Sequence, residues 1–193
     1  MKAWWQLWEK CFTPDECVKL IEYAKTLPPV EGGIGHGGQF HQNKQVRSSI
    51  IRWIPRYPRG DAFMLDFFAR ISARAEWSNN QAFGFDLRHY TEVQFTEYDS
   101  EYDGHYDEHE DNTWVTKEFM PEERKMSMVI QLSDPKDYEG GRLMLKNDPL
   151  PDDRFRGQGD MIFFPSFNRH SVTPVTSGKR YSLVTWFKGP PFR

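Results

Sequence analysis

Residues 159–187 read GDMIFFPSFNRHSVTPVTSGKRYSLVTWF, three largely apolar runs separated by turn residues. Apolar runs rich in β-branched and aromatic residues, bounded by Gly, Pro and Ser, are typical of strands. We therefore expect strands over Asp160–Phe164, His170–Val175 and Arg180–Phe187. Thr176-Ser177-Gly178 is expected to form a hairpin turn between the last two.

Upstream of this stretch, helical patterning gives way to strand-like patterning. Apolar residues at helical spacing predict helices over about Thr13–Leu27 and Asp61–Glu76, and the first begins with a capping box. Shorter apolar runs predict strands over Glu92–Tyr98, Met126–Leu132 and Arg142–Leu145. Helices followed by strands indicate an α+β fold, in which helices back a sandwich or barrel of strands.

A glycine-rich segment, Glu31–Gln45, lies between the two expected helices. It has five glycines and few large apolar side chains, so we expect a long loop that buries little surface. Long loops are usually either functional covers or plain connections. We interpret this one as a substrate lid, with a simple linker as the alternative.

Length and composition limit the possible classes of function. The 193 residues are expected to form a single domain, 1–193, with helical support and the loop in residues 1–90 and a β core in residues 91–193. A net charge of -3 and the lack of a long apolar run argue against nucleic-acid and membrane partners. Without a signal peptide, and with Cys11 and Cys17 as its only cysteines, the protein is expected to be reduced and cytoplasmic. Its oligomeric state is left open.

The densest group of potential metal ligands is YDSEYDGHYDEHED, residues 98–111. A His and an Asp two residues apart share one face of an extended chain, so both can reach one cation. Two such pairs overlap here, His105 with Asp107 and His109 with Asp111. Spacing alone does not choose between them.

A calcium-binding loop is the alternative interpretation of the same segment. The ligand and turn positions of an EF-hand would be filled by Asp99, Glu101, Asp103, Gly104 and Glu110. An EF-hand needs a helix on each side, whereas the residues before this segment alternate as in a strand. The calcium interpretation is therefore disfavoured.

A further histidine and a carboxylate-binding group follow near the C-terminus. Two His and one carboxylate on one face of an octahedral iron leave three positions for a chelating cosubstrate and dioxygen, and His170 offers the second imidazole. Arg180 has a planar fork of donors that can bind a carboxylate, and Ser182 shares its face. Alone, His170 would be read as a core histidine and Arg180 as a surface ion pair. An upstream His-x-Asp pair makes both readings less probable.

Four motifs occur together between Gln94 and Phe187. Tyr98 is followed by GHYDEHED at residues 104–111, which matches the pattern G-x-Y-x-x-H-x-D. YEGGRL at 138–143, FPS at 164–166 and HSVTPVTSGKR at 170–180 come next. This half of the chain resembles the prolyl 4-hydroxylase and PKHD-type hydroxylase group of Fe(II)/2-oxoglutarate oxygenases.

The resemblance implies a double-stranded β-helix in which His109, Asp111 and His170 bind Fe(II) and Arg180 grips the distal carboxylate of 2-oxoglutarate. It thereby selects one of the two His-x-Asp pairs. Tyr98 stands where the family often has a tyrosine that touches the cosubstrate, and Ser182 is a further candidate contact. Dioxygen is implied as the oxidant and ascorbate as a candidate reductant.

The substrate is the least constrained part of this hypothesis. The resemblance favours hydroxylation of a peptidyl proline, with a free amino acid or a small metabolite as alternatives. A non-oxygenase metal-binding module, cupin-like or calcium-binding, is the competing class. An apolar wall from Met161, Phe163, Val172, Val184 and Trp186 would exclude water if it faced inward, but both faces of these strands are apolar.

Overall fold

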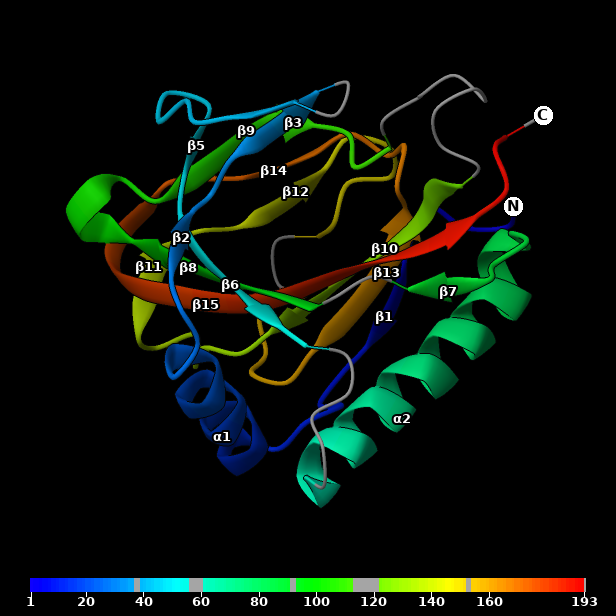
Figure 1. The fold of residues 1–193 in the computed structure, drawn as a ribbon, viewed down its shortest axis with the longest axis horizontal. Coiled ribbons are helices and arrows are strands. Elements are labelled where there is room, and N and C mark those ends of the chain that lie inside the picture. The colour runs from blue at the N-terminus through cyan, green and yellow to red at the C-terminus, as the bar shows by residue number, and fades with distance from the viewer. Residues whose placement is uncertain (37–38, 56–60, 91–92, 113–121, 152–153, 193) are drawn as a thin grey trace.

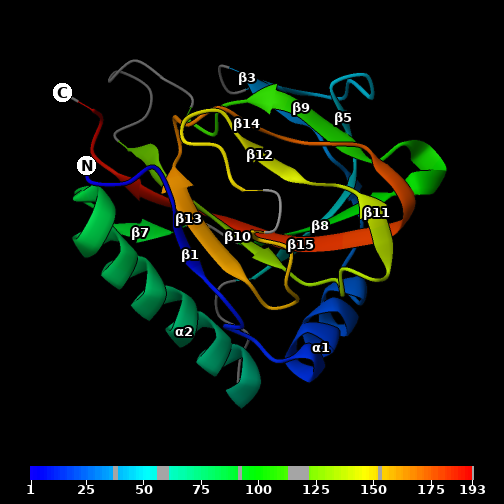
Figure 2. The same ribbon diagram turned by 180° about the vertical axis from the view of Figure 1, so that it is seen from behind.

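The computed structural model describes residues 1–36, 39–55, 61–90, 93–112, 122–151 and 154–192. Two antiparallel sheets enclose an interior, and two helices lie against the outside of the larger sheet (Figure 1 and Figure 2). The interior between the sheets is therefore the space in which a site built from strand residues can form.

Both predicted helices are confirmed, with ends within two residues of those expected. α1 spans Pro14–Lys25, and at its start the Thr13 hydroxyl accepts from the Glu16 N–H while the Glu16 carboxylate accepts from the Thr13 N–H. α2 spans Ala62–Ser78 and is capped by the carboxylate of Asp61. These caps satisfy N–H groups that a helix start leaves without a partner.

The larger sheet has the strand order β1-β13-β10-β15-β8-β6-β2, and β7 and β11 pair with β15 off this path. The predicted strands near 92–98, 126–132 and 160–164 correspond to β8, β10 and β13. Its strands are β1 Gln6–Trp8, β2 Val30–Glu31, β6 Ile50–Ile54, β7 His89–Tyr90, β8 Val93–Asp99, β10 Glu123–Gln131, β11 Tyr138–Gly140, β13 Met161–Pro165 and β15 Val175–Gly189.

The smaller sheet has the order β12-β14-β9-β5. Its strands are β5 Arg47–Ser48, β9 His105–His109, β12 Leu143–Leu145 and β14 His170–Val172. The remaining described elements are the pair β3 Ile34–His36 and β4 Gln39–His41, the π-helix η1 Asn79–Phe83 and the 3-10 helix η2 Ser100–Tyr102. The predicted strand over 142–145 is thus confirmed as β12.

The predicted hairpin at Thr176-Ser177-Gly178 is wrong. β14 lies in the smaller sheet, and β15 runs without interruption from Val175 to Gly189 in the larger one. The turn-forming residues lie inside β15, where they pair with β11. Gly178 has φ +69, and a Cβ there would lie 2.0 Å from the Asp137 carbonyl oxygen, so the glycine permits this close pairing and does not reverse the chain.

Strands in the first 90 residues are the second departure from the prediction. β1, β2 and β6 extend the larger sheet and β5 extends the smaller one, so this part of the chain is more than helical support and a loop. The Glu31–Gln45 segment also contains the antiparallel pair β3 and β4. Gly37 and Gly38, part of the same prediction, lie outside the described residues. These strands are two to five residues long, too short for periodicity to reveal.

The two faces of the larger sheet have different surroundings. Met161 and Phe163 of β13 pack with the helices, whereas Ile162 and Phe164 point into the space between the sheets. Val172 of β14 joins them in the interior. Met161 and Phe163 are therefore not part of an interior wall, a choice that the sequence did not resolve.

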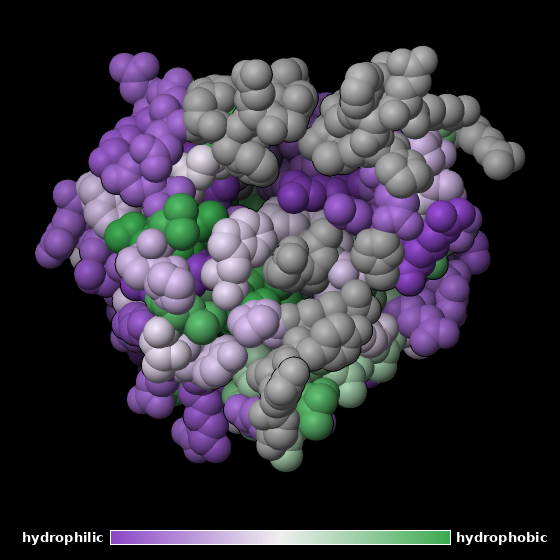
Figure 3. All heavy atoms as spheres, in the orientation of Figure 1, coloured by the Kyte–Doolittle hydropathy of each residue, from purple (hydrophilic) through white to green (hydrophobic). Residues whose placement is uncertain are grey.

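None of the described helices is long and apolar enough to cross a membrane. On the face shown in Figure 3, hydrophobic side chains occur in groups among hydrophilic ones. Exposed large hydrophobic side chains include Val30 and Trp53, both on strands at the β2 end of the larger sheet.

Candidate active site

Three of the predicted metal ligands come together at one end of the smaller sheet. His109 is the last residue of β9, Asp111 follows two residues later, and His170 begins β14 and pairs with His109 in register. Their ligand atoms all lie within 4.8 Å of one another. His109 Nε2 is 3.8 Å from Asp111 Oδ1, and His170 Nε2 is 3.4 Å from Asp111 Oδ2. Strand pairing thus brings together ligands that are about sixty residues apart in the sequence.

Backbone carbonyls orient both imidazoles. His109 Nδ1 donates to the Asp107 oxygen at 2.8 Å, and His170 Nδ1 donates to the Asn168 oxygen at 2.9 Å. A carbonyl oxygen only accepts, so each Nδ1 carries the proton and each Nε2 keeps its lone pair. The two Nε2 atoms near Asp111 are therefore the ones that can bind a metal ion.

Two serines hold Asp111, one through its carboxylate and one through its backbone. Its Oδ2 accepts from Ser127 Oγ on β10 at 2.6 Å, and its backbone N–H donates to the Ser166 carbonyl at 2.9 Å. Ser166 Oγ lies 2.9 Å from Ser127 Oγ and can donate to it. A carboxylate fixed in this way would need little reorganisation to bind a metal ion.

Burial and charge set the protonation of the ligands. Asp111 and His170 are buried. Burial and the neighbouring His170 hold the pKa of His109 well below its usual value. Burial disfavours the charged form of Asp111, but His170 and His109 hold the pKa of Asp111 below its usual range. At neutral pH His109 is therefore neutral and Asp111 ionised, the forms that coordinate a metal.

The competing His-x-Asp pair does not join this cluster. Both ring nitrogens of His105 contact backbone oxygens, Nδ1 that of Asp103 at 2.6 Å and Nε2 that of Gln45 at 3.1 Å. His105 thus ties β9 to the end of the glycine-rich segment. Asp99, the first position of the calcium-loop alternative, bonds the Glu101 N–H and pairs with Lys179.

The N-terminal flank of that segment also differs from an EF-hand. The chain enters the segment from β8, and the 3-10 helix η2 and the strand β9 lie within it. A calcium loop at this position would lack the helix that precedes its ligands.

Arg180 is buried in β15 and faces the interior between the sheets, only 2% exposed. Its Nε donates to Gln131 Oε1 at 3.0 Å, and Gln131 Nε2 donates to Tyr138 Oη at 2.8 Å. Tyr98 pairs with Arg180 in register, and its ring centroid is 5.6 Å from the Arg180 Cζ. Ser182 is buried two residues along the same strand. The structure therefore places Tyr98 next to Arg180 on the neighbouring strand and Ser182 next to it along the same strand.

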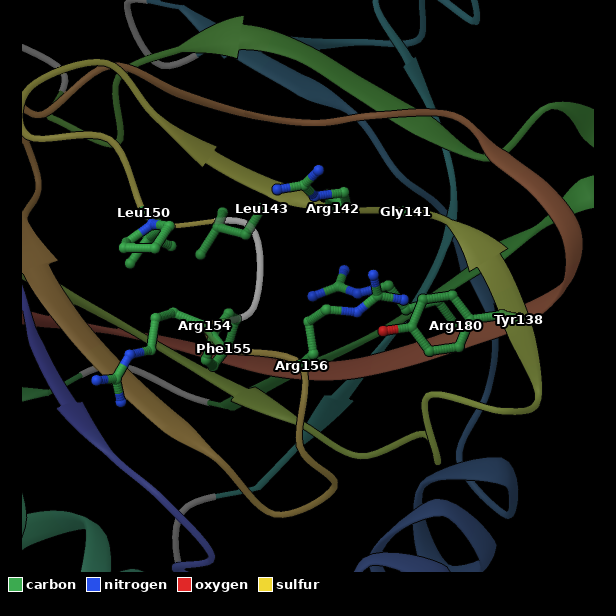
Figure 4. A pocket seen from close by; sticks show the side chains of 10 residues that line it. Tyr138, Gly141, Arg142, Leu143, Leu150, Arg154, Phe155, Arg156 and Arg180 are labelled. Atoms are coloured by element: carbon green, nitrogen blue, oxygen red, sulfur yellow. The ribbon is translucent and has the colours of Figure 1, made fainter.

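A pocket opens beside Arg180 (Figure 4). Arg156 and Arg180 both line it and extend their guanidinium groups into it, and Phe155 adds an apolar wall. Arg154 also lines the pocket, but its side chain is turned away and pairs with Glu9 at 3.0 Å. The pocket is therefore a place for an anion with an apolar body.

The roles of Ser127 and Gln131 as partners of the predicted site residues were not predicted from the sequence. Both lie in the run 126–132, where they are polar residues with the same parity in a stretch otherwise rich in apolar side chains. Such residues are buried by the strand and need hydrogen-bond partners there. That pattern was the available signal.

The family model of the 2OG-Fe(II) oxygenase superfamily matches residues 93–188, about half of the chain. The matched residues include the three clustered ligands and Arg180. The chain belongs to this superfamily. A PKHD-type hydroxylase from Saccharophagus degradans is 38% identical over 63 residues, which cover 33% of this chain and 28% of the relative.

Solved structures place the chain in the same fold. A Pseudomonas putida prolyl-4-hydroxylase superposes with a TM-score of 0.68 at 22% identity, covering 97% of this chain and 94% of that one. A Trichoplax adhaerens prolyl hydroxylase in complex with a peptide fragment gives a TM-score of 0.73 at 16% identity, with coverages of 95% and 83%. The predicted α+β fold with a double-stranded β-helix is confirmed.

The side chains of this superfamily member fit the group that the superfamily name implies. Two imidazole Nε2 atoms and one carboxylate are the donor set typical of non-haem Fe(II) oxygenases. Each histidine has its Nδ1 bonded elsewhere, and the carboxylate keeps Oδ1 on the side of His109. Fe(II), 2-oxoglutarate and dioxygen are the cofactor and cosubstrates of this superfamily.

Proposed function

We propose that this chain is an Fe(II)- and 2-oxoglutarate-dependent hydroxylase that acts on a peptidyl proline. The observation that carries the proposal is the convergence of His109, Asp111 and His170, whose ligand atoms lie within 4.8 Å of one another. A facial set of three protein ligands leaves coordination positions for a chelating cosubstrate and for dioxygen. When bound, the iron and the cosubstrate supply the activation of dioxygen that C–H hydroxylation requires.

The protein's part is to hold these ligands and to keep the site dry. The carbonyls behind His109 and His170 fix which ring nitrogen faces the ion, and Ser127 fixes the rotation of Asp111. Ile162 and Phe164 pack in the interior beside them, and the rings of Phe164 and His170 are 4.8 Å apart. Water is thereby kept from one side of the site.

Arg180 is the residue that we assign to the distal carboxylate of 2-oxoglutarate. It is buried, its side chain points into the pocket of Figure 4, and Arg156 adds a second positive charge there. A guanidinium binds a carboxylate through two parallel N–H···O bonds, a strong contact where water is excluded. Tyr98, opposite Arg180 on β8, and Ser182, two residues along β15, supply further hydroxyl groups for the cosubstrate.

A peptide substrate is supported by groups next to Asp111. Trp186 is buried, and among the described residues its indole N–H has no acceptor. The Arg124 Cζ lies 3.8 Å from the Trp186 ring centroid, and the same guanidinium donates to the Asp111 carbonyl at 3.5 Å. A buried N–H without a partner is uncommon, and the carbonyl oxygen of a bound peptide would satisfy it.

A peptide hydroxylation assay tests this proposal. Proline-containing peptides are incubated with the protein, Fe(II), 2-oxoglutarate, ascorbate and oxygen, and mass spectrometry locates any added oxygen atom. The proposal predicts one oxygen atom on a prolyl residue, absent with the Asp111→Ala protein. The alternative is that the enzyme forms succinate and modifies a free amino acid or small metabolite but no peptide. That result would show that the substrate belongs to the alternative class.

A further inference from the structure

Gln131 and Tyr138 form a hydrogen-bonded chain that ends on Arg180. All three side chains are buried, on β10, β11 and β15. Gln131 Oε1 accepts from Arg180 Nε at 3.0 Å, and Gln131 Nε2 donates to Tyr138 Oη at 2.8 Å. Within the described part of the chain, this is the one hydrogen bond made by the Arg180 guanidinium.

The bond to Nε determines which edge of the guanidinium remains available. A guanidinium is planar, so fixing the direction of Nε–H fixes the plane and leaves the Nη1 and Nη2 edge to bind a carboxylate with two bonds. Arg180 lines the pocket, so this edge is available to an anion that enters it. Gly141 makes room for the arrangement, because a Cβ there would lie 2.9 Å from Arg180 Cδ.

The Nε–H of Arg180 determines the orientation of the glutamine amide. If the amide were rotated by half a turn, its NH₂ group would face this Nε–H, and two donors would oppose each other. With the oxygen facing Arg180, the amide NH₂ donates to the Tyr138 hydroxyl, so both ends of the amide have a partner. Buried networks of this kind hold one geometry when every member has a partner.

We infer that Gln131 is a positioning residue, itself held by a hydrogen bond to Tyr138, that fixes Arg180 for binding the distal carboxylate of the cosubstrate. This inference rests on the proposed function. A residue that acts only through Arg180 must affect ligands that carry a distal carboxylate and spare ligands that lack one. A residue that merely supports the barrel must affect both kinds of ligand alike.

Calorimetric titration of the Mn(II)-loaded protein separates these two roles. The probes are 2-oxoglutarate and oxalate, since oxalate chelates a metal but has no distal carboxylate. Gln131→Met should weaken 2-oxoglutarate binding by about tenfold or more, as expected for loss of a hydrogen bond to a charged group, and should leave oxalate binding unchanged. Tyr138→Phe should give a smaller loss with the same selectivity.

Gln94→Met is the matched control. Gln94 is also a buried glutamine, on β8, and its amide donates to Thr96. This variant should bind both probes as the unmodified protein does. Equal weakening of both probes by Gln131→Met, or unchanged 2-oxoglutarate binding, would overturn the inference.

Two further variants, Gln131→Glu and Arg180→Met, cover the cases in which Gln131→Met does not fold or the proposed function is wrong. If Gln131→Met does not fold, Gln131→Glu retains an acceptor for Arg180 while its negative charge opposes an incoming carboxylate, so it should lose 2-oxoglutarate binding and keep oxalate binding. Failure of the proposed function has a different signature. In that case the unmodified protein does not bind 2-oxoglutarate, or Arg180→Met binds it as well as the unmodified protein does.

Discussion

Ser127 Oγ donates to Asp111 Oδ2 at 2.6 Å, which links β10 of the larger sheet to the carboxylate beside His109 and His170. Partners that orient a metal ligand typically contribute about ten- to a hundredfold to metal affinity. The Ser127→Ala protein should therefore bind Fe(II) about tenfold more weakly. Metal titration of this variant checks the expectation. Ser72→Ala is the control, because Ser72 lies on α2, where its hydroxyl bonds the Phe68 carbonyl.

The choice between the two His-x-Asp pairs predicts opposite effects for two histidines. Replacing His109 with Ala removes an Nε2 ligand and should abolish tight Fe(II) binding. Replacing His105 with Ala should leave the metal bound, because both of its ring nitrogens contact backbone oxygens. Measuring bound iron after dialysis compares the two proteins. Loss of iron from the His105 variant with retention by the His109 variant would reverse the assignment.

Removal of the Arg180 guanidinium should weaken the cosubstrate and not the metal. Arg180→Met is expected to cost about 2 to 5 kcal/mol of 2-oxoglutarate binding, since a buried carboxylate would lose its charged partner. Lys179 cannot substitute, because its amine pairs with Asp99. Arg154→Met is the control, because Arg154 lines the same pocket but pairs with Glu9. Equal affinities of the two variants would place the carboxylate elsewhere.

The substrate lid remains a prediction for the glycine-rich segment. In both ribbon views β3 lies beside the end of β9, the strand that finishes at His109 (Figure 1 and Figure 2). Replacing residues 34–41 with a short Gly-Ser link should reduce hydroxylation of the primary substrate and leave iron and 2-oxoglutarate affinity unchanged. Gly32 must be kept, since a Cβ there would lie 2.3 Å from Ser49 Oγ.

Uncoupled turnover of 2-oxoglutarate should rise in the shortened protein, because the segment would no longer hold the primary substrate against the site. Comparison of succinate and hydroxylated product gives the coupling ratio. A shortened protein that hydroxylates its substrate at the original rate would make the segment a plain connection.

One ion pair predicts how stability depends on pH. Hydrogen bonding from Arg70 on α2 holds the pKa of Glu16 on α1 below its ordinary value of 4.5. A folded-state pKa below the unfolded one stabilises the protein at higher pH, and this stabilisation is lost as the pH falls through the folded-state value. Glu16→Gln should lower the unfolding free energy by about 1 kcal/mol at neutral pH. The difference from the unmodified protein should vanish in acid.

Urea unfolding at several pH values measures this difference. Glu22→Gln is the control, because Glu22 is exposed on the same helix. A constant difference between the Glu16 variant and the unmodified protein across the acid range would show that the carboxylate charge is not the cause.

Sequence patterns predicted the elements that are long enough to show a periodicity. The apolar stripes of both helices and the alternation of β8 and β10 were sufficient for this. β5 and β2 are only two residues long, so they exist because longer strands pair with them. The predicted turn at Gly178 is wrong because Gly178 lies inside the continuous strand β15, where it pairs with β11.

The candidate site divides in the same way. Residue types and spacing indicated His170, Arg180 and two alternative His-x-Asp pairs, and the family resemblance selected His109 and Asp111. The structure brings His109, Asp111 and His170 together. Gln131 could not be linked to Arg180, because that contact joins residues 49 positions apart on neighbouring strands. Such a pair depends on register across the sheet, which a single sequence does not contain.

Formation of succinate from 2-oxoglutarate under Fe(II) and oxygen tests the central claim most directly. The unmodified protein should form succinate only when iron, oxygen and 2-oxoglutarate are all present. Folded His109→Ala, Asp111→Ala and His170→Ala proteins should form none above the protein-free background. Two results would contradict the account. One is succinate formation by these variants at the original rate. The other is no succinate from the iron-loaded unmodified protein with any proline peptide, free amino acid or small metabolite that is offered.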